Sequence, residues 1–209
     1  MRHARPTRLR ARRTTSAVAA SAAAAVLLSA CGGQPGAQET VGPTAGAPSP
    51  TSEQSYAPTL PPYTSDVELT DEEEQDVEEL LLLIDEFNIL TGTLEDGSPD
   101  RASSLEGSVD KELLESHIDG MNETLSDGIR TRGPVTPMSA IILEHSDESA
   151  VASICYDFSA YQIFNIENPD KALYPDRPSE HAYDTAANRV DGDWVIVDRT
   201  DSESTCEDH

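Results

Sequence analysis

The sequence predicts an α+β domain in which two N-terminal helices pack on a curved antiparallel sheet. Three observations predict this class. Apolar residues recur at helical spacing after Thr70 and again after Asp110. From Val135 the period changes to the alternation typical of strands. Asp191-Gly192 then separates two strand-like segments and is the sequence of a two-residue hairpin turn.

The first helix begins at Thr70, where Thr70-Asp71-Glu72-Glu73 forms a capping box. The acidic run 71–74 lies where the helix dipole favours negative charge, which explains it better than a metal site does. Gly92 is predicted to end the helix. The apolar face that follows the cap contains Val77, Leu80, Leu81, Ile84, Phe87 and Asn88.

The second helix is predicted over residues 110–126 and follows a segment, 93–107, that is rich in Gly, Ser and Asp and is typical of a loop. Gly120 weakens this helix and Gly128 ends it. Its apolar positions are Leu113, Leu114, Ile118, Met121 and Leu125.

Four strands are predicted after the helices, over residues 138–144, 150–164, 181–190 and 194–199. A two-residue turn at Asp191-Gly192 pairs Val190 with Asp193 and Arg189 with Trp194. The segment 165–179 is longer than an ordinary hairpin connection and has an aromatic tip at Tyr174. It is either a binding element or a loosely ordered connection.

The N-terminus has a basic head, a short apolar run from Ala17 to Leu28 and then two small residues, the layout of a secretory signal peptide. Leu28-Ser29-Ala30-Cys31 resembles the lipobox of bacterial lipoproteins, in particular those of high-GC Gram-positive bacteria. The resemblance implies that residues 1–30 are removed and that Cys31 carries a diacylglyceryl group. The alternative is an ordinary secretory signal in which Cys31 is accidental.

The segment 31–65 is predicted to be a disordered tether. Of the 34 residues from 32 to 65, 21 are Pro, Gly, Ser or Thr, and such a segment cannot bury enough apolar surface to offset its ordering entropy. Residues 66–209 then form one domain. The predicted location is extracytoplasmic, at the outer face of the cell membrane.

The mature chain is strongly acidic. All 39 acidic residues and only eight of the 14 basic ones follow residue 30, so its net charge is near −31. This balance excludes nucleic acid as a partner and argues against contact with anionic lipid beyond the anchor. The charge serves either solubility in a negative envelope or attraction of cations or a basic partner.

Cys155 and Cys206 remain as an even pair once Cys31 is lipidated, and in an exported chain they are predicted to form a disulfide. The alternative is a reactive or metal-binding pair, which no Cys-x-x-Cys spacing supports.

Across residues 66–206, the chain resembles the NTF2-like (SnoaL-like) cone fold of actinobacterial lipoproteins. The resemblance rests on Cys155-Tyr156-Asp157, on Trp194-Val195-Ile196-Val197 and on the late Cys206. The family contains isomerases, dehydratases and hydrolases as well as non-catalytic binding domains, so the fold alone does not supply a function. Domains of this family often pair through the sheet, which makes a homodimer a further hypothesis.

The candidate pocket residues are Tyr156, Asp157, Tyr183, Asp184 and Trp194. Strand alternation places Asp157 on the same face as Cys155 and opposite Tyr156. No catalytic motif is present, and the histidines are dispersed as expected of surface residues. No metal or cofactor is therefore predicted. The leading hypothesis is a lipid-anchored, non-catalytic domain that binds a small apolar ligand or a protein. The alternative is an isomerase or hydrolase that uses Asp157 or Asp184 with a tyrosine.

Overall fold

The computed structural model describes residues 57–209, so the predicted signal peptide, Cys31 and the tether as far as residue 56 lie outside the described residues. The described part is α+β, as predicted. Its elements are β1 (Tyr63–Ser65), α1 (Asp71–Gly92), α2 (Ser98–Ala102), η1 (Ser103–Leu105), α3 (Lys111–Ser126), β2 (Ile129–Arg132), β3 (Thr136–His145), β4 (Ser149–Asp157), β5 (Gln162–Asn165), β6 (Asn168–Ala172), β7 (Glu180–Val190), β8 (Asp193–Asp201) and η2 (Cys206–Asp208).

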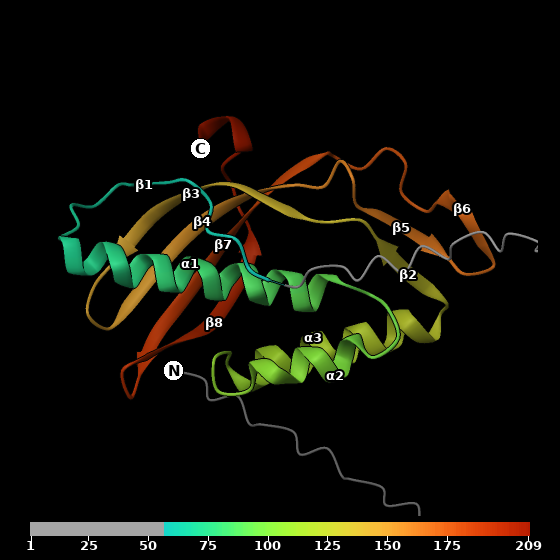
Figure 1. Cartoon of the computed structure of the whole chain (residues 1–209), viewed down its shortest axis with the longest axis horizontal. Helices are drawn as coiled ribbons and strands as arrows, with labels where there is room; N and C mark the ends of the chain where they lie inside the picture. The colour runs from blue at the N-terminus through green and yellow to red at the C-terminus, as the bar shows by residue number, and fades with distance from the viewer. Residues whose placement is uncertain (1–56) are drawn as a thin grey trace, which may run out of the picture. The chain divides into compact units, whose positions relative to one another are not determined.

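The strands form two sheets. One has the order β1-β3-β4-β7-β8 and the other the order β2-β5-β6. Figure 1 shows α1 in front of the larger sheet, with β2, β5 and β6 grouped at one end. The larger sheet is mixed rather than wholly antiparallel, because β1 runs parallel to β3. Register shifts in the β3–β4 and β7–β8 pairs mark bulges, which bend a sheet.

Helix α1 begins as the sequence predicts. The Thr70 side chain accepts from the Glu73 N–H, and the Glu73 carboxylate accepts from the Thr70 N–H at 2.7 Å. The helix then buries one face against the sheet. The sheet residues that meet this face include Ile142, Ile154, Tyr156 and Ile196, each at most 1 % exposed. Burying an apolar side chain of this size contributes about 1.5–3 kcal/mol.

The interior between α1 and the sheet is filled by side chains. Leu81, Ile84, Tyr156 and Trp194 belong to one hydrophobic core, and Tyr183 packs against it. The space in which the sequence suggested a ligand pocket is therefore largely occupied by the core.

Several predicted boundaries differ from the observed ones because the pairing is not local. The single strand expected over 150–164 is two strands, β4 and β5, separated by a turn in which Asp157 accepts from the Ser159 N–H at 2.7 Å. The loop expected over 93–107 contains α2 and η1. The loop expected over 165–179 contains β6, which pairs with β5.

Two further strands were not expected. β2 was not predicted, and β1 lies in residues assigned to the tether. The hairpin at Asp191-Gly192 has the predicted register, and both of its residues have positive φ angles, 55° and 101°.

The sheet face opposite α1 carries the disulfide. Cys155 on β4 is joined to Cys206 in η2, as predicted, with a Cα–Cα distance of 5.4 Å. The C-terminal segment thereby covers Ser153 and Ala182, which are buried. No helix in the described part of the chain is long and apolar enough to span a membrane.

Removing the disulfide is expected to destabilise the domain. The bridge closes a loop across 51 positions, for which chain entropy gives about 4 kcal/mol. The double variant Cys155→Ala/Cys206→Ala should lose an unfolding free energy of this order in urea titrations, and reduction of the unaltered chain should have a similar effect. A loss below about 1 kcal/mol would contradict the predicted contribution.

Candidate functional site

A pocket of about 200 Å³ lies at the C-terminal half of α1. The first described residues of the chain, 57–59, form one side of it, and the loop before β3 forms another. Its lining residues are Ala57, Thr59, Asp85, Asn88, Ile89, Gly92, Thr93, Gly133, Pro134, Val135, Thr136, Pro137 and Tyr161. Asp85 is the one charged residue among these described lining residues.

Asp85 is completely buried. It lies on the apolar face of α1, four residues after Leu81 and eight after Val77, so helix geometry turns it toward the core. Its Oδ2 accepts a hydrogen bond from the Thr59 N–H at 2.8 Å. Its Oδ1 is buried, and no described group donates to it.

Asn88 lies almost one turn further along α1 and is also buried. Its Nδ2 donates to the Ile84 carbonyl at 2.9 Å and to the Tyr156 hydroxyl at 2.7 Å. The first of these bonds fixes the orientation of the amide, because a carbonyl only accepts. The Asn88 Oδ1 is therefore left buried without a donor. Two acceptor oxygens of α1, on Asp85 and Asn88, thus lack partners beside the pocket.

Burial raises the pKa of Asp85 to about 6, although the hydrogen bond from the Thr59 N–H works in the opposite direction. Burial also raises the pKa of Tyr156, and the nearby charge of Asp85 adds to that effect. The carboxylate is consequently ionised at neutral pH while Tyr156 stays a neutral phenol.

The hydroxyl groups of Thr93 and Tyr161, which line the pocket, already donate hydrogen bonds to the backbone. Thr93 donates to the Ile89 carbonyl at 2.7 Å, and Tyr161 donates to the Gly92 carbonyl at 2.6 Å. Within residues 57–209, no group of three or more His, Cys, Asp or Glu side chains is arranged to hold a metal ion. The unmet hydrogen-bonding capacity of Asp85 and Asn88 therefore calls for a donor.

The five sequence-predicted pocket residues do not share one site. Tyr156 and Tyr183 lie on the α1 side of the sheet, with their ring centroids 6.3 Å apart, and Arg199 stacks on Tyr183 at 3.7 Å. Asp157 is held in the turn after β4, where hydrogen bonds from the Ser159 N–H and hydroxyl lower its pKa. Asp184 pairs with Ser153 on the side that carries the disulfide.

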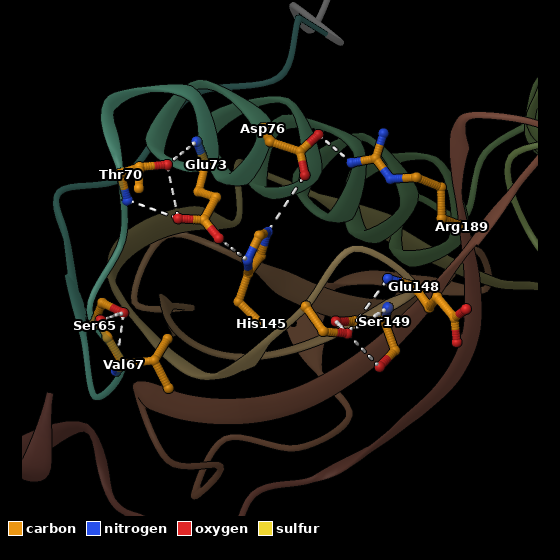
Figure 2. A network of polar contacts seen from close by, with 10 residues as sticks. Ser65, Val67, Thr70, Glu73, Asp76, His145, Glu148, Ser149 and Arg189 are labelled. Carbon is orange, nitrogen blue, oxygen red and sulfur yellow. Dashed lines mark hydrogen bonds and ion pairs between the residues drawn. The ribbon is translucent and has the colours of Figure 1, made fainter.

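Trp194 lies apart from these residues, in a polar cluster at the N-terminal half of α1. The cluster consists of Asp76, His145, Arg189 and Trp194. Figure 2 shows Asp76 of α1 between His145 of β3 and Arg189 of β7. Arg189 pairs with Asp76, donates to the Gly192 carbonyl and stacks on Trp194 at 4.2 Å.

Asp76 pairs with both Arg189 and His145, so the cluster ties α1 to β7 and β3. The buried Trp194 Nε1 has no acceptor among the described residues. The His145 side chain is only 3 % exposed, which corrects its assignment as a surface residue. Burial alone raises the pKa of Asp76, but the hydrogen bonds and charges of Arg189 and His145 together bring it below its usual value.

Asp85 was missed in the sequence, and the role of Asn88 was not recognised. Helical periodicity indicates which face of a helix is buried, but it does not show which polar groups on that face lack hydrogen-bond partners. The available signal was an acid at the i+4 position from a core leucine, on the face expected to be buried.

Comparisons with known proteins do not identify the chain. No family model matches it, and no curated protein matches it. Among solved structures it is similar to the intermembrane space region of the chloroplast protein ARC6, with 12% identity and a TM-score of 0.45, over 66% of this chain and 100% of that chain. This similarity is too low to support a conclusion about function.

Replacing the buried carboxylate should stabilise the domain at neutral pH. Because the pKa of Asp85 is raised from 3.8 to about 6, the folded state binds its proton more tightly than the unfolded state does. The contribution of this proton to stability is therefore fully present below pH 4 and is lost as the pH rises through 6. Asp85→Asn should raise the unfolding free energy at pH 7 by up to about 3 kcal/mol and remove this component of the pH dependence.

Urea unfolding at pH 5 and pH 7 measures both effects. Asp119→Asn is the matched control, since it removes one carboxylate from an exposed position on α3. An Asp85→Asn variant with the same pH dependence as the unaltered chain would show that Asp85 is not held in an unfavourable charged state.

Proposed function

We propose that this protein is a cell-envelope lipoprotein, anchored at the outer face of the cell membrane through a lipid on Cys31. Its α+β domain is an NTF2-like cone that binds a small ligand without transforming it. The anchor rests on the resemblance of residues 28–31 to a lipobox. The cone rests on the resemblance in the order of helices and strands, with Cys155 on β4 and Cys206 near the C-terminus. The binding function rests on the unpartnered Asp85 and Asn88 oxygens beside the pocket.

Each of these oxygens is costly to the free protein. Burying a polar group without a hydrogen-bond partner lowers the stability of the folded state by about 1–3 kcal/mol, and by more if the group is charged. Native structures contain few such groups, and those present often serve a function. A ligand that donates hydrogen bonds to Asp85 and Asn88 removes this destabilisation when it binds. The free energy recovered in this way contributes to the affinity for the ligand.

The pocket limits the ligand to a few non-hydrogen atoms. Its 200 Å³ is below the ~300–1,000 Å³ of drug-sized sites and corresponds to about seven water molecules at ~30 Å³ each. The lining includes the polar Asp85 and Asn88 beside the apolar Ile89 and Val135. The ligand is therefore amphipathic, in place of the purely apolar one expected from the sequence.

An enzyme is the second candidate, favoured by one observation. A carboxyl group with a pKa of about 6 in a pocket is suited to general acid–base chemistry. It ranks second because the Tyr156 hydroxyl is buried and already held by Asn88, and because Asp157 and Asp184 lie elsewhere. Turnover of a small substrate that is lost in Asp85→Asn would establish this candidate instead.

Binding is tested by screening small fragments against the full chain by NMR. Fragments with N–H or O–H donors should shift the amide signals of Thr59, Ile89 and Thr93. Val135→Phe, which fills the pocket, should abolish the shifts. Val190→Phe should keep them, because Val190 is exposed on the hairpin away from the pocket. If no fragment shifts these signals in the unaltered chain, the binding function is contradicted.

The anchor is tested separately by cell fractionation. Cys31→Ala removes the thiol that receives the lipid, so the exported protein should move from the membrane fraction to the soluble extracellular fraction. Cys206→Ala removes a different cysteine and should leave the protein in the membrane fraction. Membrane retention of a Cys31→Ala chain from which residues 1–30 have been removed would contradict a lipid anchor at this residue.

A further inference from the structure

The pocket described above also indicates what kind of ligand it takes. We propose that it binds a small organic primary ammonium ion, whose N–H groups donate to the Asp85 Oδ1 and the Asn88 Oδ1. This inference rests on the proposed binding function and specifies its ligand class.

The free acceptor oxygens of the pocket match the N–H donors of an ammonium group. Asp85 and Asn88 are three residues apart on α1, so they lie on the same face of the helix. Both Oδ1 atoms are acceptors, both are buried and neither has a donor. An ammonium group offers three donors and no acceptor, which complements such a pair.

The charge of the pocket favours a cationic ligand. Asp85 is the one charged residue in the described lining, and its hydrogen-bond partner is a neutral backbone N–H. The cation Arg199 of β8 stacks on Tyr183. A buried charge without a counter-ion is unfavourable. A neutral donor would complete the hydrogen bonds but leave the charge, and an anion would add a second charge of the same sign.

The size of the pocket and the geometry of its acceptors favour a primary ammonium group over other organic cations. A guanidinium group carries five N–H donors in a fixed plane, more than two acceptors can satisfy. A quaternary ammonium group has no N–H to donate. A primary ammonium group on a short alkyl chain places its charge at Asp85 and its carbons against Ile89, Val135 and Pro137, within the available 200 Å³.

Residues 57–59 contribute to the selection. The Thr59 N–H donates to the Asp85 Oδ2 at 2.8 Å, which leaves the buried Oδ1 as the carboxylate oxygen without a donor. Ala57 and Thr59 also line the pocket, so this segment forms part of the wall that confines the ligand.

The test titrates the full chain with three probes in 0.15 M salt at pH 7.5, followed by NMR at the amides of Thr59, Ile89 and Thr93. Propylammonium carries both charge and N–H donors, 1-propanol is its neutral counterpart, and tetramethylammonium has charge without donors. Propylammonium should bind at least ten-fold more tightly than either of the others. Asp85→Asn should weaken it at least ten-fold, while Asp119→Asn, an exposed control, should not.

Three results would overturn the proposal. Equal binding of 1-propanol and propylammonium, unchanged in Asp85→Asn, would leave a binding pocket with a different ligand class. Equal binding of tetramethylammonium would reveal general attraction to an acidic protein. An absence of propylammonium binding, while other fragments in the screen still shift the pocket signals, would remove the ammonium ligand and keep the binding function. Urea unfolding of Asp85→Asn verifies that this variant is folded.

Discussion

The packing of α1 on the larger sheet is the contact on which the rest of the structure depends. Most of the buried core belongs to this helix or to the strands it covers. Two polar links fix how the helix lies. Near its start, Asp76 pairs with Arg189 and His145, and near its end Asn88 donates to Tyr156. Because both links join α1 to strands, the position of the helix also determines where Asp85 lies.

Asp85 is the exception within this interface. The other side chains on the same helical face gain by burial, whereas a carboxylate loses its hydration and receives only one backbone N–H in return. The residue stands at the end of the core, where residues 57–59 and the loop before β3 leave a pocket. A protein that kept this position only for packing would be more stable with an apolar or amide side chain there. The unfavourable carboxylate is what links the fold to the proposed binding function.

Local features of the fold could be predicted from the sequence. The capping box at Thr70, the extent of α1 and the register around Asp191-Gly192 each depend on residues close together in the chain. The disulfide was predicted from the two cysteines that remain once Cys31 is assigned to lipidation, in a chain expected to be exported. Pairings between distant segments could not be predicted in this way. β1 lies beside β3 although the paired residues Tyr63 and Ala140 are 77 positions apart, and the sequence of β1 resembles the tether that precedes it.

The candidate site was harder to predict for the same reason. Strand alternation correctly separated Tyr156 from Asp157, but it could not show that the latter closes a turn. Helical periodicity placed Asn88 on the buried face, but it could not show that Asn88 donates to Tyr156, 68 positions away, or that the Asn88 Oδ1 lacks a donor. The environment of Asp85 can be recognised only once the position of residues 57–59, which cover it, is known.

The most direct test of this account is the pKa of Asp85 itself, measured from the pH dependence of its side-chain carboxyl carbon signal in the full chain. We expect a pKa near 6 in the free protein and a clear decrease when propylammonium is present, because a bound cation favours the ionised form. A value near 3.8, unchanged by propylammonium, would show that Asp85 is an ordinary solvated carboxylate and would contradict the central claim.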